Sequence, residues 1–278
     1  MSGLVDASGV LSPFRYRGAR IRREAAGPKL AGVTDVPPAV SGLADRLAEL
    51  GWIPDLFVAG SLSMGDYVPG VSDLDLVALT DGPVDERRQA ILVRLHQDLD
   101  RGAAVGLDLG CVYVDVNELP DGDALHPTWT HGSLVHRILS GVTRAELVLH
   151  GFAIIGRPPA AVLPAMTADD VRRAARDELC GYWAWAARRP LMWLDPVIAD
   201  LGLTSMARGR YALESGRLLT KTQAVEQAHA PAWLKRQLRA RRQGELVGSP
   251  RVRTAFIAWR DAGRTVARAS CRATASQD

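Results

Sequence analysis

The sequence predicts an α+β protein of two domains: a mixed sheet with covering helices over residues 1–157, followed by an α-helical bundle over residues 158–278. The chain has 278 residues, and at roughly 150 residues per domain this length suggests two domains. Short apolar runs typical of strands occupy the first half. Past Gly156 and the prolines that follow it, long segments with helical spacing replace them.

Composition limits the class of protein. The hydrophobic residues make up 47% and the charged residues 23%, which is ordinary globular usage and excludes a mainly disordered or fibrous chain. No apolar run approaches the ~20 residues of a membrane span, and the first residues lack the pattern of a secretory signal. Cys111, Cys180 and Cys271 are scattered, which fits a reducing compartment. We therefore expect a cytoplasmic protein with no membrane partner.

The N-terminal domain begins with a segment rich in proline and glycine. Residues 1–38 are expected to form a loosely ordered leader or short edge strands. Apolar positions then recur at intervals of three and four over Val40–Leu50, which predicts a helix. Ser41 is the expected N-cap of this helix, and Gly51 is its expected stop.

Three strands and a further helix follow. Asp55–Ala59 and Leu74–Leu79 are short apolar runs that predict a pair of strands. Arg87–Leu99 has helical spacing, and Leu107–Val116 predicts a third strand. Alternation of this kind is typical of a mixed sheet covered by helices.

The second half is expected to be helical throughout. Thr167 is a good helix start, because Asp169 and Asp170 place negative charge in the first turn, where the helix dipole favours it. Proline or glycine separates the predicted helices, which span Thr167–Arg189, Leu201–Ser215, Thr222–Ala228, Trp233–Arg242 and Val252–Ala269.

Charge is distributed unevenly along the chain. Residues 201–278 carry 15 Lys and Arg against 5 Asp and Glu, a net charge of +10, whereas the net charge of the whole chain is +3. The basic residues of Lys235–Arg242 recur at helical spacing, which favours an exposed helix face over a nucleic-acid surface. A third interpretation is that basic side chains of this part meet a phosphate bound to the acidic part.

The densest chemical signal lies at the start of the second predicted strand. Asp73 and Asp75 are two residues apart, so both carboxylates leave the same face of the strand. Adjacent carboxylates repel each other, and hard oxygen ligands of this kind suit magnesium that is shared with substrate phosphates. A solvated strand start is the alternative explanation of the pair taken alone.

Other residues strengthen the first explanation. Gly60 and Ser61 follow a strand and can bring N–H groups and a hydroxyl close to a phosphate. Asp108, at the start of the third strand, is a candidate third acid. Asp115 competes for that place, and because the two differ by an odd number, they should face opposite sides of the strand.

These residues resemble a known signature. Gly60-Ser61, a gap of ten residues and then Ser72-Asp73-Leu74-Asp75-Leu76 resemble the motif of the DNA polymerase β-like nucleotidyltransferase superfamily. The segments Glu146–Pro159 and Leu203–Lys221 are similar to the aminoglycoside 3''-adenylyltransferases that inactivate streptomycin and spectinomycin. The resemblance extends over about residues 40–245.

The resemblance implies roles for the acids and serines. Asp73 and Asp75 would bind two Mg²⁺ ions, and Ser61 and Ser72 would contact the nucleotide phosphates. Asp108 takes the place of the third acid, which is a glutamate in the adenylyltransferases. In this chain the shorter Asp108 could be the base, a metal ligand or both.

The resemblance also implies partners for the helical domain. Arg208 and Lys221 correspond to two cationic contacts to ATP, and their separation of thirteen residues matches. The implied reaction is transfer of AMP from ATP to a hydroxyl of a small polar acceptor, most simply an aminoglycoside-type antibiotic, by a monomeric enzyme. Nucleotidylation of a protein or an RNA end, and a non-catalytic nucleotide-binding module, are the alternatives.

A segment rich in tryptophan admits two interpretations. Trp183, Trp185 and Trp193, with Asp195 and Asp200, lie where the adenylyltransferases bind their cationic drug. Aromatic faces and carboxylates attract cations. Core tryptophans beside a proline-linked loop are the alternative.

Overall fold

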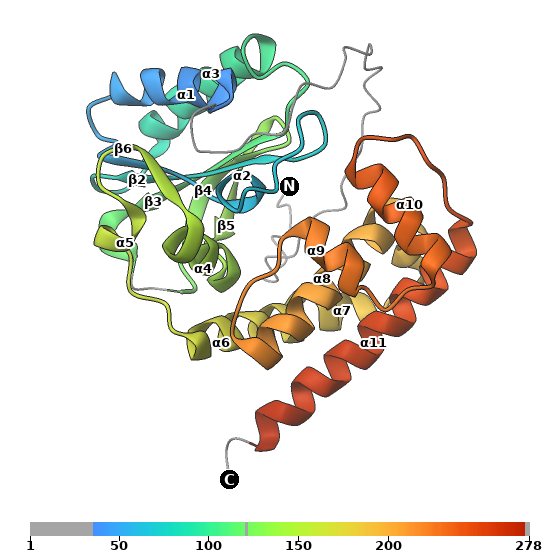
Figure 1. Ribbon diagram of the computed structural model, residues 1–278. Coiled ribbons are helices and arrows are strands. Elements are labelled where there is room, and N and C mark those ends of the chain that lie inside the picture. Colours follow the sequence, from blue (N-terminus) through green and yellow to red (C-terminus); the bar gives the residue numbers. More distant parts are fainter. Residues whose placement is uncertain (1–35, 120–121, 276–278) are drawn as a thin grey trace, which may run out of the picture.

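The computed structural model of the protein describes residues 36–119 and 122–275. It has a mixed six-stranded sheet with helices on both faces, beside a bundle of helices (Figure 1). The predicted α+β class is therefore confirmed. The expected leader falls outside the described residues, except for residues 36–38. Among the described residues, no helix combines the length and the apolar character needed to cross a membrane.

The first helix starts earlier than expected. Helix α1 spans Pro38–Ala48, with Pro37 at its N-cap. Ser41 is not the cap, as the sequence had suggested, but an exposed residue inside the helix. Pro38 explains the difference, because the fixed φ of proline suits the first turn and its missing N–H is not needed there.

The predicted strands form the centre of the sheet. They are β1 (Asp55–Val58), β2 (Leu74–Thr80) and β3 (Leu109–Asp115). The sheet order is β5-β4-β3-β2-β1-β6. Strands β2 and β3 are parallel, and the other pairs are antiparallel.

The outer strands were not predicted. They are β4 (Leu125–Thr130), β5 (Ser133–Ile138) and β6 (Phe152–Ile155). Strand β5 is largely exposed or half-buried and β4 contains Pro127, so neither has the uninterrupted apolar pattern of a central strand. The short helix α2 (Gly60–Ser63) and the 3₁₀ turn Val116–Glu118 follow β1 and β3.

Alternate residues of the central strands serve two cores. One face packs on α1 and α3 (Glu86–Arg101), and Leu56, Leu74 and Leu76 belong to that core. The opposite face carries Phe57 and Val77, among others, and packs on α4 (Gly141–His150) and α5 (Pro159–Val162) (Figure 1). The second core is the one next to the helical bundle.

The long helix expected over Thr167–Arg189 is present but contains a π-helical turn. Helix α6 covers Ala168–Glu178, a π-helical turn covers Leu179–Trp183, and α7 covers Ala184–Ala187. Thr167 caps α6 through a capping box with Asp170. Such π turns are rare, mostly single-turn insertions in α-helices, and the spacing of the apolar residues did not predict this one.

The remaining helices agree with the expected order. A 3₁₀ segment at Pro190–Leu194 precedes α8 (Pro196–Ser215), which starts five residues before the expected Leu201. Asp195 causes the earlier start, since its side chain accepts the Val197 N–H at 2.8 Å. The chain continues through α9 (Lys221–Gln227), α10 (Ala232–Arg242) and α11 (Arg251–Ala275).

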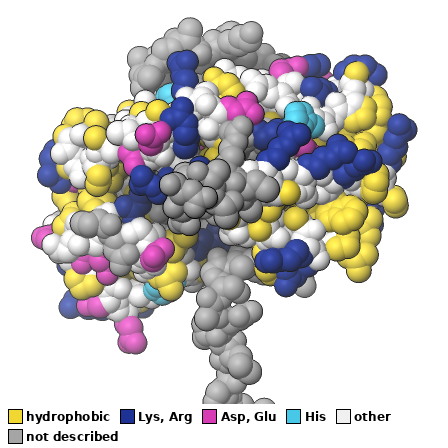
Figure 2. Space-filling model, turned by 90° about the horizontal axis from the view of Figure 1, so that it is seen from below, with side chains coloured by type: hydrophobic (Ala, Val, Ile, Leu, Met, Phe, Trp, Pro, Cys, Tyr) yellow, Lys and Arg dark blue, Asp and Glu magenta, His cyan; other side chains and the backbone are white. Residues whose placement is uncertain are grey.

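Two regions are used below. The sheet region is residues 36–163, because Val162 and Leu163 still pack on the sheet, and the helical region is residues 164–275. Helix α4 of the sheet region also contributes Ala145 to the core of the helical region. Seen from below, Lys and Arg side chains stand among apolar ones over the helical region, on the right of Figure 2.

Candidate active site

Asp73 and Asp75 lie at the start of β2, on the sheet face that α4 covers. Asp75 alternates with Leu74 and Leu76, which point to the other core, and so shares the face of Val77. The loop before β2, residues 64–73, connects it to α2 and is called here the signature loop. The two acids therefore lie at the N-terminal end of a central strand, next to the helical region.

Gly60 allows the Asp75 carboxylate to approach the turn after β1. Its φ is +60°, and a Cβ at this position would lie 2.1 Å from Asp75 Oδ2. A glycine is required there for both reasons. The next residue, Ser61, is buried, and its hydroxyl has no hydrogen-bond partner among the described residues. A buried hydroxyl without a protein partner needs an explanation, and a contact with a bound ligand is one.

The acid pair is electrostatically unfavourable without a cation. Burial raises the pKa of Asp75 to about 6, with Lys221 opposing the shift and Asp73 adding to it. Glu146 on α4 raises the pKa of Asp75 further. Burial also raises the pKa of Asp73, against the effect of Lys221. Asp73 and Asp75 thus have the donor chemistry for a divalent cation that also binds phosphate oxygens.

Asp108 lies beside Asp73 and faces His131. It precedes β3 immediately, and its carbonyl accepts the Leu74 N–H at 2.8 Å. Its carboxylate is more than half exposed and lies 3.6 Å from His131 Nδ1. Asp108 adds to the raised pKa of Asp73. Within the described parts of the chain, however, no three His, Cys, Asp or Glu side chains form a group that could hold a metal ion.

Asp115 lies at the other end of β3. The β2–β3 register pairs Leu74 with Leu109 but Thr80 with Asp115, so a full strand length separates Asp115 from the acid pair. Its carboxylate accepts the Asn117 N–H at 3.0 Å and caps the 3₁₀ turn. The structure places Asp108 next to Asp73 and gives Asp115 a capping contact.

The two cations expected from the helical region both reach the sheet region. Lys221, the first residue of α9, has its Nζ 3.8 Å from Asp73 Oδ2. Arg208 on α8 donates to Glu146 on α4 and, at 3.1 Å, to the Leu219 carbonyl. Arg208 is thus held in place by protein groups on both regions.

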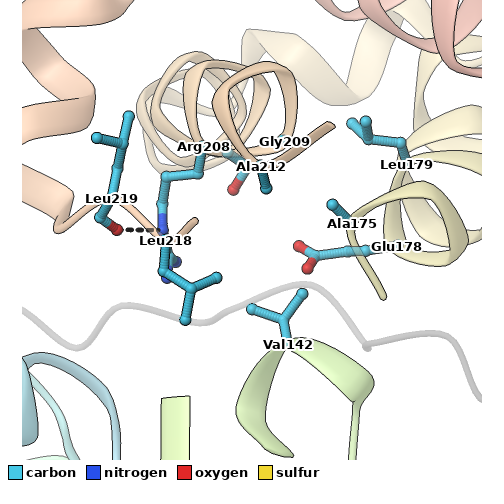
Figure 3. A pocket seen from close by; sticks show the side chains of 10 residues that line it. Val142, Ala175, Glu178, Leu179, Arg208, Gly209, Ala212, Leu218 and Leu219 are labelled. Atoms are coloured by element: carbon cyan, nitrogen blue, oxygen red, sulfur yellow. Dashed lines mark hydrogen bonds between the residues drawn. The ribbon is translucent and has the colours of Figure 1, made fainter. Parts of the chain in front are cut away.

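A pocket opens beside Arg208. Figure 3 shows Arg208 and Leu218 on one side, Glu178 on the other, and Val142 of α4 closing the base. The Glu178 carboxylate points into the pocket and accepts the Trp183 indole N–H at 3.3 Å. Burial raises the pKa of Glu178, and Arg208 opposes this shift. The pocket therefore offers a carboxylate and a guanidinium between the two regions.

Sequence reasoning missed three charged residues of this site. Glu146 lay inside a segment quoted for its resemblance, but no role followed from it. Asp66 lies in the signature loop, and Arg242 was one of many arginines in the basic part. Arg242 hydrogen-bonds to Ser72 and to Asp66. The position of Asp66 within the motif was a signal for that residue, whereas the sequence offered none that separates Arg242 from the adjacent Arg241.

The tryptophan-rich segment is mainly core. Trp183 and Trp193 are buried in the core of the helical region. Asp195 caps α8, and Asp200 forms a two-point ion pair with Arg241 at 2.6 and 2.9 Å. The interpretation as core tryptophans is therefore confirmed for these two residues.

Comparisons with known proteins agree with this geometry. Residues 40–118 match the model of the nucleotidyltransferase domain family. No curated protein matches the sequence. A solved structure of the spectinomycin adenyltransferase AAD(9) from Enterococcus faecialis, with ATP and spectinomycin, superposes with a TM-score of 0.63 at 14% identity, covering 82% of this chain and 98% of that one. The chain therefore contains a nucleotidyltransferase domain over residues 40–118, which supports a transferase activity, and its fold resembles that of a spectinomycin adenyltransferase.

Proposed function

We propose that the protein transfers AMP from ATP to a hydroxyl group of a small polar acceptor of the aminoglycoside type. The observation that carries this proposal is the pair Asp73 and Asp75: Asp75 lies against Gly60, and Asp73 faces Lys221 of the helical region. The adenyltransferase with a similar fold was solved with ATP and spectinomycin, which supports ATP and an aminoglycoside as the substrates.

Asp73 and Asp75 would hold the magnesium ions of the reaction. When bound, Mg²⁺ supplies neutralisation of triphosphate charge and activation of the attacking hydroxyl. The carboxylates fit this role because burial and a neighbouring carboxylate, Asp108 for Asp73 and Asp73 for Asp75, raise the pKa of both, and a bound cation offsets these effects.

Other residues would bind and orient the nucleotide. Lys221 is close enough to Asp73 to exchange that contact for a phosphate oxygen. The unpartnered hydroxyl of Ser61 would donate to a second phosphate oxygen. Transfer of this kind depends on positioning and electrostatic stabilisation and needs no protein nucleophile.

Asp108 would accept the proton of the acceptor hydroxyl. It is on the same sheet face as Asp73, is exposed to an incoming acceptor, and lies 3.6 Å from His131, which can pass the proton to solvent. Asp108 is therefore assigned the role of base rather than that of a third metal ligand.

The basic residues of the helical region argue against a polyanionic acceptor. Of the four arginines in the basic run Lys235–Arg242, three contact a carboxylate of the chain: Arg239, Arg241 and Arg242. A small acceptor is thus better supported than an RNA end.

The direct test is a substrate screen. The protein is incubated with Mg²⁺, each of the four nucleoside triphosphates and a panel that includes spectinomycin and streptomycin, and pyrophosphate release and product mass are measured. We expect an adduct that is one AMP heavier with ATP only, and no release after chelation of Mg²⁺. If the panel gives no adduct while a protein or RNA is labelled, the acceptor class is wrong.

A further inference from the structure

Arg242 connects the end of α10 to the signature loop. It is the last residue of α10, and its side chain is only 10% exposed. Nη1 donates to Ser72 Oγ at 2.8 Å, and Nη2 donates to the Asp66 carbonyl and, at 3.1 Å, to Asp66 Oδ2. Nε is also buried and has no partner among the described residues. The guanidinium is therefore held by its two Nη groups, both on the signature loop.

Asp66 extends this connection to α9. Its Oδ2 also accepts the N–H of Thr222, in the first turn of α9, at 3.0 Å. Lys221, the preceding residue, lies 3.8 Å from Asp73 Oδ2. Two helices of the helical region thus hold the signature loop from two points, and both points lie within seven residues of Asp73.

The contact with Arg242 decides how the Ser72 hydroxyl can bond. Ser72 Oγ accepts the Val68 N–H at 2.9 Å and Arg242 Nη1 at 2.8 Å. A serine hydroxyl has two acceptor lone pairs and one O–H donor. Since both lone pairs are used by donors from the chain, the O–H is left to donate. A ligand that meets Ser72 must therefore offer an acceptor, and a phosphate oxygen offers nothing else.

We propose that Arg242 is a positioning residue that fixes the Ser72 hydroxyl as a hydrogen-bond donor to a phosphate of the bound nucleotide. This inference rests on the proposed function, because it takes the ligand at Ser72 to be a nucleoside triphosphate. Arg242 acts through Ser72 and touches no reacting group. Lysine cannot replace it, because one ammonium does not reproduce the fixed separation of Nη1 and Nη2.

The test compares Arg242 with its neighbour Arg241. Arg241 lies on the same helix as Arg242, and Arg241→Gln breaks a two-point ion pair with Asp200 of α8 but leaves the signature loop untouched. We expect Arg242→Gln and Arg242→Lys to raise the KM for ATP roughly tenfold, as for one hydrogen bond to a charged group, with a smaller change in kcat. Arg241→Gln should leave the KM for ATP within about twofold of the wild type.

A double variant tests whether Arg242 acts through Ser72. Ser72→Ala should raise the KM for ATP by a similar factor, and Ser72→Ala with Arg242→Gln should be no worse than Ser72→Ala alone, within about twofold. If the two effects multiply in full, or if Arg242→Gln behaves like Arg241→Gln, the inference is overturned.

Equilibrium binding of ATP and adenosine distinguishes three outcomes: a positioning role of Arg242, a loss of folding in the variant, and a failure of the proposed function. Arg242→Gln should weaken ATP but leave adenosine unchanged, at a melting temperature close to that of Arg241→Gln. Equal loss of both ligands, with a lower melting temperature, would mean a purely structural role and overturn the inference. A wild-type protein that binds no nucleoside triphosphate would overturn the proposed function, and this inference with it.

Discussion

Where the sheet region and the helical region meet, their charged side chains have opposite signs. Three ion pairs between them have the acid on the sheet region and the cation on the helical region: Glu146–Arg208, Asp66–Arg242 and Asp73–Lys221. The first two pairs are largely buried, whereas Lys221 and Asp73 remain about one-third and one-half exposed. Two of the contacts are thus suited to joining the regions, and the third is accessible to a ligand.

The largest expected effect tests the accessible contact. Asp73→Asn and Asp75→Asn should each lower turnover by at least roughly 1000-fold, because each removes a charge that would face the nucleotide. Stability should change little, since burial raises the pKa of both carboxyls and already disfavours the charged forms. Pyrophosphate release and thermal unfolding measure the two quantities.

Asp115→Asn is the matched control for the acid pair. It changes an aspartate at the far end of the neighbouring strand, and turnover should stay within about twofold of the wild type. If Asp108 is the base, Asp108→Asn should have a lower turnover than the wild type. Silence of both Asp108→Asn and Asp115→Asn would show that neither is the third acid.

The next effect tests the buried contacts. Arg208→Met leaves the buried Glu146 carboxylate without its cation and should lower the free energy of unfolding by about 3 kcal/mol. Arg239→Met, in an exposed pair with Glu226 inside the helical region, should cost at most about 1 kcal/mol. Urea unfolding measures both. Equal costs would mean that the contact between the regions has no special weight.

The last effect concerns the acid stability of the sheet region alone. His96 is buried, stacks on Trp129 and lies 2.6 Å from the Tyr113 hydroxyl, and burial lowers its pKa from 6.5 to about 3. Between these values the unfolded chain takes up a proton that the folded chain does not. The free energy of unfolding should therefore fall as the pH falls through this window, by at most about 1.4 kcal/mol per pH unit.

His96→Gln removes this proton uptake and can keep a hydrogen bond to Tyr113. The free energy of unfolding of His96→Gln, followed from pH 6 to pH 4, should fall less steeply than that of the wild type. Parallel slopes would show that His96 is not the group responsible.

Local pattern was enough to predict the central strands and most helices. A continuous apolar run predicts a strand that is buried on both faces, and β1 is such a strand. The acidic pair lies at the start of a second run of this kind, which forms β2. Strand β5, half-exposed and with His136 and Arg137 among its residues, gave no such signal. The π turn in the helix after Thr167 was not predicted either, because such turns are rare and have no simple sequence pattern.

The partners of charged side chains were beyond local pattern. Arg242 and Ser72 are 170 residues apart, and nothing in the sequence around Arg242 distinguishes it from Arg241, which pairs with Asp200 instead. Which of two adjacent arginines faces the signature loop depends on the direction of α10 in the folded molecule. The composition predicted that the two parts of the chain carry opposite charge. Which acid pairs with which arginine is seen only in the folded structure.

Helix α4 sets a limit on how the molecule can be divided. Ala145 lies in the core of the helical region, its neighbour Leu147 lies in a core of the sheet, and Glu146 between them binds Arg208. A chimera joined at residue 157 would pair this helix with a foreign bundle and disturb both interiors. Exchange of acceptor specificity between relatives should therefore transfer residues 141–150 together with the bundle, although they precede it in the chain.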